Sequence, residues 1–155
     1  MEPGLDCLTC KSISGERRIS PGPTIYETAH WLVEHAYPCS MKGWLVLVLK
    51  RHAQALHELT EQESRELGEL QGMTTRVLFD VLDCEKEYSM CLAESAGFNH
   101  IHVHLVAKPR DLPAELRGVS IFALLKPGEN TVPPGDIERF CEELQGEFVK
   151  MEGVR

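Results

Sequence analysis

Three histidines at alternate positions are the most chemically capable group in the chain. They are His100, His102 and His104, separated by Ile101 and Val103. In an extended strand, residues two apart point to the same face, so this spacing places three imidazole rings together. Each neutral ring has one donor and one acceptor, and crowding opposes charging more than one of them. The pattern favours an anion, a metal ion or a reaction, although histidines on a solvated edge strand are the plain alternative.

Two cysteines near the start of the chain form a second candidate site. Cys7 and Cys10 are two residues apart, a spacing at which both sulfurs bind one zinc ion while the chain turns. The pair is only half of a tetrahedral site, and a redox pair or two free thiols are alternatives. A redox site is disfavoured because no strand-to-helix context surrounds the motif. The scattered cysteines, expected to be free thiols, are Cys39, Cys84, Cys91 and Cys141.

The elements that must position these groups are those of an α+β protein with an antiparallel sheet. The segments with strand composition are residues 24–33, 44–49, 87–93 and 99–108, and a last short strand is predicted over 119–125. The first two are separated by a turn-rich stretch, which predicts a meander of antiparallel strands. Residues 11–23 are rich in serine, glycine and proline and are predicted to form a loop.

One long helix is predicted between the second and third strands. Thr60 and Glu63 form a capping box, and apolar residues recur at helical spacing as far as Val81. Gly68 and Gly72 weaken this helix by roughly 1 kcal/mol each relative to alanine. We therefore expect the sheet or a second copy of the chain to pack closely against the helix face that carries these two glycines.

A C-terminal helix is predicted over about residues 134–151, with Asp136 as its cap. Its apolar stripe, expected to dock on the core, consists of Ile137, Phe140, Cys141, Leu144 and Phe148. The chain has 155 residues, of which 43% are hydrophobic and 26% charged. This composition predicts a single domain over residues 1–155 with its core in about residues 5–125.

Charge and hydropathy argue against several classes of protein. The formal net charge of −8 disfavours a general nucleic-acid binder. Local positive charge remains beside the histidines, from Lys50, Arg51, Lys108 and Arg110, which could contact phosphates or simply face water. No apolar run is long enough to span a bilayer and no secretory signal is visible, so we expect a cytoplasmic protein with no membrane partner.

The run from His100 to Val106 resembles the motif of the histidine-triad nucleotide-binding family, in which histidines alternate with apolar residues. The resemblance extends to Cys7-Leu8-Thr9-Cys10, to residues 26–33 and 43–48 and to the pair Arg51-His52, and covers about residues 5–125. Within the family, the chain is most similar to the zinc-containing branch of dinucleotide-hydrolase-like members. The resemblance implies a fold with about five antiparallel strands, one long central helix and a C-terminal helix, and a homodimer.

The resemblance also implies a role for each triad histidine. His102 would attack the α-phosphate of a nucleotide to form a nucleotidyl-histidine intermediate. His104 would contact the phosphate and help the leaving group, and His100 would orient the site. The zinc ligands implied by the resemblance are Cys7, Cys10, His52 and His100. Zinc is the cofactor that the resemblance implies, and no magnesium motif is visible.

The loop before the triad departs from the family pattern. Many members have a glycine-glutamine or glycine-serine step there, whereas this chain has Gly97-Phe98-Asn99. Asn99 could replace part of the phosphate-binding donor set, but Phe98 cannot, which leaves rate and substrate preference open. Leu49 likewise stands where a proline is common. By resemblance, the nucleoside would contact residues 31–33.

Three functions are compatible with these observations. The first is a nucleotide hydrolase or nucleotidyl transferase acting on a purine dinucleoside polyphosphate or nucleoside phosphoramidate. The second is a nucleotide-binding scaffold with little turnover. The third is a zinc-stabilised interaction module in which the histidines mainly bind metal. Formation of a nucleotidyl adduct distinguishes the first from the other two.

Overall fold

Five antiparallel strands form one sheet in the order β1-β2-β3-β5-β4. The computed structural model describes residues 6–154. The strands are β1 (Tyr26–Glu27), β2 (Trp31–His35), β3 (Trp44–Leu49), β4 (Lys86–Met90) and β5 (His102–Lys108). The predicted α+β class and five-stranded antiparallel sheet are therefore confirmed.

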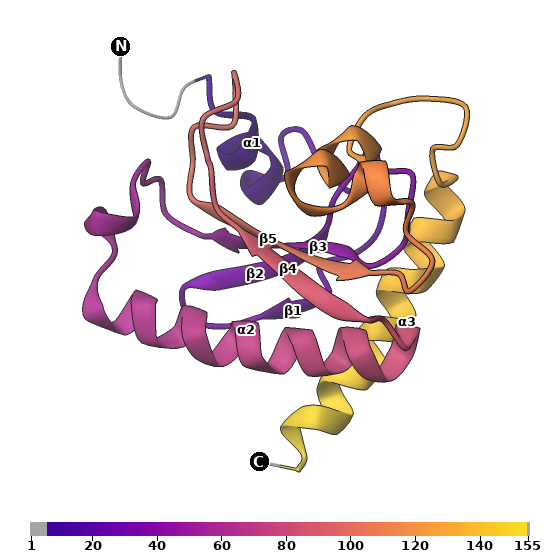
Figure 1. The fold of residues 1–155 in the computed structure, drawn as a ribbon. Helices are drawn as coiled ribbons and strands as arrows, with labels where there is room; N and C mark the ends of the chain where they lie inside the picture. Colours follow the sequence, from indigo (N-terminus) through magenta and orange to yellow (C-terminus); the bar gives the residue numbers. More distant parts are fainter. Residues whose placement is uncertain (1–5, 155) are drawn as a thin grey trace.

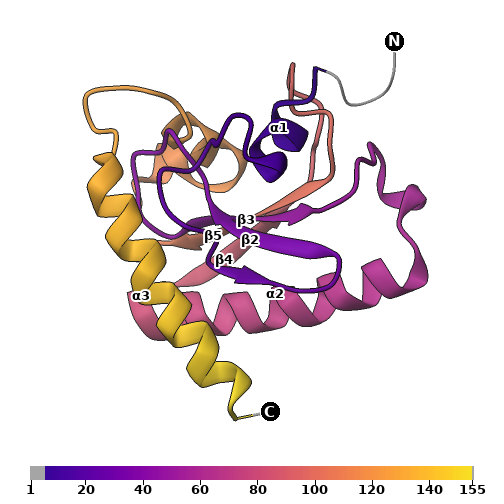
Figure 2. The same ribbon diagram turned by 180° about the vertical axis from the view of Figure 1, so that it is seen from behind.

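Helices cover both faces of this sheet (Figures 1 and 2). The α-helices are α1 (Leu8–Ser14), α2 (Glu61–Leu82) and α3 (Pro134–Glu152), and short 3-10 helices span Leu56–Glu58, Ala114–Leu116 and Gly118–Leu124. Helices α2 and α3 pack on one face, whereas α1 and the last 3-10 helix lie over the other (Figure 1). No helix within residues 6–154 is long and apolar enough to cross a membrane.

The alternation of side chains along the strands divides the core into two parts. On the side of α2 and α3, the larger cluster includes Trp31, Val33, Leu47 and Leu105. On the other side, Trp44 and Val106 join a smaller cluster beneath the Gly118–Leu124 helix. In the register of β3 and β5, Val46 pairs with His104 and Val48 with His102. The two histidines therefore lie on the face away from α2.

Several predicted boundaries differ from the structure. The strand predicted over residues 24–33 is broken by a turn at Thr28, whose N–H donates to the Trp31 carbonyl at 2.9 Å, so that β1 and β2 form a hairpin. The strand predicted over 119–125 is wrong, because Gly118–Leu124 is a 3-10 helix. The loop predicted from residue 11 begins later, because α1 continues to Ser14.

Helix α2 begins with the predicted capping box. The Glu63 N–H donates to Thr60 Oγ1 at 3.2 Å, and the Thr60 N–H donates to the Glu63 carboxylate at 2.8 Å. A Cβ atom at Gly68 or Gly72 would meet no atom of another described element within 4 Å. The sheet is therefore not the close neighbour expected there, and a second copy of the chain stays a prediction.

Helix α3 spans the predicted segment but has a different cap. Pro133 occupies the cap position and Pro134 the first helical position, which suits the fixed φ of proline. Asp136 lies inside the first turn and does not cap the helix. All five residues of the predicted apolar stripe are buried.

We expect Glu63→Gln to lower the free energy of unfolding by about 1 to 3 kcal/mol at pH 7. Two hydrogen bonds from Arg51, at 2.6 and 2.8 Å, and the capping contacts lower the pKa of the buried Glu63 to about 2. Because this folded-state pKa is depressed, the stabilisation is present above the unfolded pKa and is lost as pH falls from about 4.5 to about 2. Arg51 is partly exposed, so solvent screening limits the effect.

Urea unfolding of both proteins at pH 7 and pH 3 measures this contribution. The difference between wild type and Glu63→Gln should shrink at pH 3. Glu61→Gln is the matched control, because Glu61 lies in the same helical turn with an exposed side chain. Its effect should stay below about 0.5 kcal/mol. A difference for Glu63→Gln that is equal at both pH values would contradict the role of the charge.

Candidate active site and metal centre

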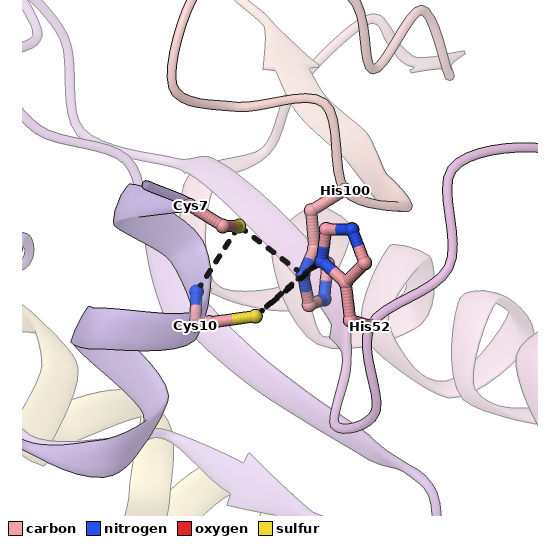
Figure 3. Close-up of side chains that lie close together, drawn as sticks. All are labelled: Cys7, Cys10, His52 and His100. Carbon is pink, nitrogen blue, oxygen red and sulfur yellow. Dashed lines mark hydrogen bonds between the residues drawn. The ribbon is translucent and has the colours of Figure 1, made fainter. Parts of the chain in front are cut away.

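Four side chains from distant parts of the sequence meet beside the start of β5 (Figure 3). They are Cys7 and Cys10 at the beginning of α1, His52 after β3, and His100 before β5. Their four candidate ligand atoms all lie within 4.8 Å of one another. Cys7 also caps α1, because its Sγ accepts a hydrogen bond from the Cys10 N–H at 3.4 Å. The residues implied as zinc ligands are thus one cluster.

The spacing of these atoms fits a tetrahedral zinc ion. Cys10 Sγ lies 3.4 Å from the Nδ1 atoms of both His52 and His100, and these two nitrogens are 3.3 Å apart. Cys7 Sγ lies 3.6 Å from His100 Nδ1. Zinc bonds of about 2.0 to 2.3 Å in a tetrahedron separate neighbouring ligand atoms by about 3.3 to 3.8 Å. The donor set and these four distances therefore suit zinc.

The hydrogen bonds around the cluster support the same conclusion. His100 Nε2 lies 2.7 Å from the Leu49 carbonyl, which can only accept, so the ring proton is on Nε2 and Nδ1 keeps its lone pair. Burial and the neighbouring Cys7 raise the pKa of Cys10 to about 11. A divalent cation reverses this preference because it stabilises the thiolate. The Cys10 thiol is thus poorly suited to ionise without a cation beside it.

A cavity of about 430 Å³ opens on the same face of the sheet. Its floor is formed by β2, β3 and β5, and its walls by α1 and the chain around the Gly118–Leu124 helix. Its apolar lining includes Ile13, Ile19, Leu32, Val48 and Phe122. This volume and largely apolar lining suit a small organic ligand.

His102 and His104 line this cavity with their rings 4.8 Å apart. His102 Nδ1 lies 2.7 Å from the His100 carbonyl, so it carries the ring proton and leaves the lone pair on Nε2. His104 Nδ1 accepts from the Trp44 Nε1–H at 3.0 Å, so in the neutral ring the proton is on Nε2. The neutral pair therefore combines a lone pair on one ring with an N–H donor on the other.

Both rings favour the neutral form. Burial lowers the pKa of His104 to about 4, helped by the nearby His102. Burial also lowers the pKa of His102, and its bond to the His100 carbonyl partly opposes that shift. A neutral imidazole near pH 7 is a competent nucleophile, because its lone pair is free.

Comparison with known proteins gives the fold a name. No family model and no curated protein matches the sequence. Among solved structures, a Zn-bound histidine triad family protein from Mycobacterium smegmatis aligns with a TM-score of 0.68 and 17% identity, covering 96% of this chain and 97% of that one. A hypothetical histidine triad nucleotide-binding protein from Sulfolobus tokodaii aligns with a TM-score of 0.66 and 18% identity, over 96% and 93% of the chains.

A third structure agrees with these two. A HIT family protein from Bacillus anthracis aligns with a TM-score of 0.59 and 18% identity, covering 97% of this chain and 98% of that one. This chain has the histidine-triad fold. The three alignments span nearly the whole of each chain.

The structure brings some of the predicted site residues to the metal cluster or the cavity and leaves others outside both. The strand predicted over 99–108 begins only at His102, so His100 precedes β5 and joins the cysteines. Asn99 is exposed and is not part of the cavity lining, whereas Ser95 and Phe98 are. Of the residues proposed to contact the nucleoside, Leu32 lines the cavity, while Trp31 and Val33 are buried in the core on the opposite face.

The basic residues expected near the phosphates are engaged elsewhere. Each forms an ion pair with a carboxylate: Lys50 with Glu27, Arg51 with Glu63, Lys108 with Glu85 and Arg110 with Asp83. None of these four cations lines the cavity. Within the described chain, Lys126 is the lysine that does. Of the two roles that the sequence left open for these four residues, direct contact with a phosphate in the cavity is therefore the less favoured one.

Sequence reasoning missed several residues around the two cavity histidines. Trp44 bonds His104, and Phe122 packs edge-on against the same ring with centroids 5.2 Å apart. Glu34 lines the cavity and is held by Arg18 at 2.7 and 3.0 Å. The alternation of Trp44, Val46 and Val48 places them on one face, but only the register with β5 places that face beside the histidines.

Proposed function

We propose that this chain is a histidine-triad family member, a zinc-containing nucleotide hydrolase or nucleotidyl transferase that acts through a nucleotidyl-histidine intermediate. The observation that carries the proposal is the pair of imidazoles in the cavity wall, one with a free lone pair on Nε2 and the other with an Nε2–H. A nucleophile beside a hydrogen-bond donor suits displacement at a phosphoryl group.

His102 serves as the nucleophile in this proposal. Its Nε2 lone pair forms a bond to the α-phosphorus while the bond from phosphorus to the leaving group breaks. The leaving group departs with that electron pair and takes up a proton. Water then forms a bond to phosphorus as the bond to Nε2 breaks, which releases the nucleoside monophosphate and returns a proton. One water molecule is consumed in each cycle.

His104 and His100 have supporting roles. The Nε2–H of His104 donates a hydrogen bond to a phosphoryl oxygen or to the leaving atom, where negative charge develops. The backbone carbonyl of His100 fixes the ring of His102, while its own ring contributes to the metal centre. Asn99 remains our candidate for an additional phosphate contact from the exposed loop.

Cys7, Cys10, His52 and His100 would hold the zinc ion. Bound there, zinc supplies a structural crosslink between α1 and the segment that enters β5. Because α1 also forms a wall of the nucleotide cavity, this crosslink would keep that wall beside His102. The proposed role of the metal is therefore to order the site.

Of the two substrate classes, a purine nucleoside phosphoramidate fits the electrostatics better than a dinucleoside polyphosphate. A polyphosphate brings several negative charges, which need cationic partners. Lys50, Arg51, Lys108 and Arg110 are all paired with carboxylates, and the whole chain carries a net charge of −8. A single phosphoryl group needs little more than Lys126 and the two histidines.

We expect Lys126→Gln to raise KM for a nucleoside phosphoramidate roughly fivefold, with kcat little changed. An exposed ion pair contributes up to about 1 kcal/mol, which corresponds to that factor. Initial rates across substrate concentrations measure both constants. Lys50→Gln is the matched control, since Lys50 is paired with Glu27 and lies outside the cavity. An equal rise in KM for both variants would mean that Lys126 acts only through overall charge.

The function itself is tested with adenosine 5′-phosphoramidate and a diadenosine polyphosphate as probes. Intact-protein mass spectrometry follows the adenylyl adduct while chromatography follows AMP release. We expect a transient adduct and AMP, with the phosphoramidate turned over faster. Tight AMP binding with neither adduct nor turnover would replace the proposal with a nucleotide-binding scaffold. No nucleotide affinity, together with unfolding on chelation, would replace it with a zinc-stabilised interaction module.

A further inference from the structure

Trp44 forms a hydrogen bond with His104, one of the two histidines that line the cavity. Its indole is fully buried on β3, and its Nε1 lies 3.0 Å from His104 Nδ1. We propose that Trp44 is a positioning residue that holds His104 in the Nε2–H tautomer, so that the cavity always presents an N–H donor beside the lone pair of His102. The kinetic part of this inference rests on the proposed function, whereas the tautomer does not.

The chemistry of the indole N–H makes this contact directional. An indole nitrogen donates a hydrogen bond and has no lone pair with which to accept one. His104 Nδ1 must therefore be the acceptor, and the single proton of the neutral ring resides on Nε2. In the Nδ1–H tautomer and in the doubly protonated ring, the hydrogen on Nδ1 would point at the indole hydrogen of Trp44. Both forms would therefore leave a buried N–H donor without an acceptor.

Packing keeps the two rings in this arrangement. Phe122 lies edge-on to both, with ring centroids 5.4 Å from Trp44 and 5.2 Å from His104. Trp44 and His104 are themselves perpendicular, with centroids 5.9 Å apart. Val46 pairs directly with His104 across the two strands, so Trp44 is its diagonal neighbour on the same face. Phe122 therefore packs against both partners of the hydrogen bond.

Two different hydrogen-bond partners thus hold the two cavity histidines in opposite tautomers. His102 donates from Nδ1 to the His100 carbonyl, which leaves a lone pair on its Nε2. His104 accepts at Nδ1 from Trp44, which leaves a hydrogen on its Nε2. Within the described residues, Thr74 Oγ1 is the one buried side-chain nitrogen or oxygen atom without a partner. The Nε2 atoms of His102 and His104 are without a hydrogen-bond partner among the described residues but are not among these buried atoms, so both are accessible from the cavity.

Without Trp44, His104 would be free to take either tautomer. In the Nδ1–H form its Nε2 lone pair would face the phosphoryl oxygens and repel them, and no donor would stabilise the developing charge. We therefore expect Trp44→Phe, which keeps an aromatic ring but removes the donor, to lower kcat about tenfold. KM should change less than twofold, because the apolar walls of the cavity remain.

Trp31→Phe is a closely matched control. Trp31 is also fully buried, and its Nε1–H donates to the Glu63 carbonyl at 3.0 Å, but it packs on the opposite face of the sheet. Both variants lose the same atoms and one buried hydrogen bond. A loss of activity that comes only from weakened packing would therefore occur in both.

The decisive measurement is ¹⁵N NMR of the histidine rings in the native protein and both variants. We expect native His104 to show an unprotonated Nδ1 and a protonated Nε2, unchanged in Trp31→Phe and mixed in Trp44→Phe. A proton on Nδ1 of native His104 would overturn the inference even if Trp44→Phe fails to fold. An unchanged tautomer or an unchanged kcat in folded Trp44→Phe would also overturn it. A native chain without turnover refutes the proposed function, while the ring shifts still decide the tautomer.

Discussion

We expect His102→Ala to lower kcat/KM for a nucleoside phosphoramidate by about 10⁴-fold or more, because the substitution removes the nucleophile itself. The ring of His102 makes one hydrogen bond with the described residues, to the backbone carbonyl of His100, so its loss disturbs little else. The adenylyl adduct should disappear with the activity. Steady-state rates, intact mass and a thermal unfolding curve, all on the same preparation, measure the effect.

Binding and a control variant separate loss of chemistry from loss of the site. His102→Ala should bind AMP within a few-fold of the native affinity, since the apolar walls of the cavity are unchanged. His57→Ala should leave activity within twofold, because His57 is exposed on the 3-10 helix Leu56–Glu58. More than one tenth of the native activity in folded His102→Ala would show that His102 is not the nucleophile.

The features that sequence predicts well are those coded by neighbouring residues. Period-two spacing places His102 and His104 on one face of β5, and the Thr60 capping box marks the start of α2. The apolar stripe of α3 is buried as expected because a helix with one apolar face must cover it. In each case the signal and the structure it specifies lie within a few residues of each other.

The features that sequence misses depend on contacts between distant segments. Residues 119–125 have strand composition, but no sheet edge receives them, and they close over the cavity as a 3-10 helix. Trp44 meets His104 only through the register of β3 and β5. Lys126 gains importance only because Lys50 and Arg110 find carboxylate partners. The amino-acid sequence of each segment alone predicts none of these contacts.

From the sequence, the full ligand set of the candidate metal site could be predicted only through the resemblance to a known family. Cys7 and Cys10 are a local signal, but His52 and His100 lie 42 and 90 residues from Cys10. No periodicity connects positions so far apart. The structure adds what the motif lacks, namely four ligand atoms within 4.8 Å and a carbonyl that orients the ring of His100.

We expect the purified protein to contain one zinc ion per chain, and removal of that ion to lower the melting temperature by roughly 10 °C. A ligand present at a thousand times its dissociation constant stabilises the folded state by about 4 kcal/mol. In a domain of this size, each 1 kcal/mol corresponds to about 2 to 4 °C. Metal analysis, followed by thermal unfolding with and without a chelator, measures both values.

Cys10→Ser tests whether this stabilisation comes from the four-residue cluster. Cys10 is half-buried and contacts both His52 and His100, so its loss should abolish zinc binding and the effect of the chelator together. Cys91→Ser is the matched control, because Cys91 is a half-buried thiol outside the cluster and should keep its zinc. Retention of zinc by Cys10→Ser, or equal loss in both variants, would place the metal elsewhere. Because the His100 carbonyl holds the ring of His102, chelation should also lower activity.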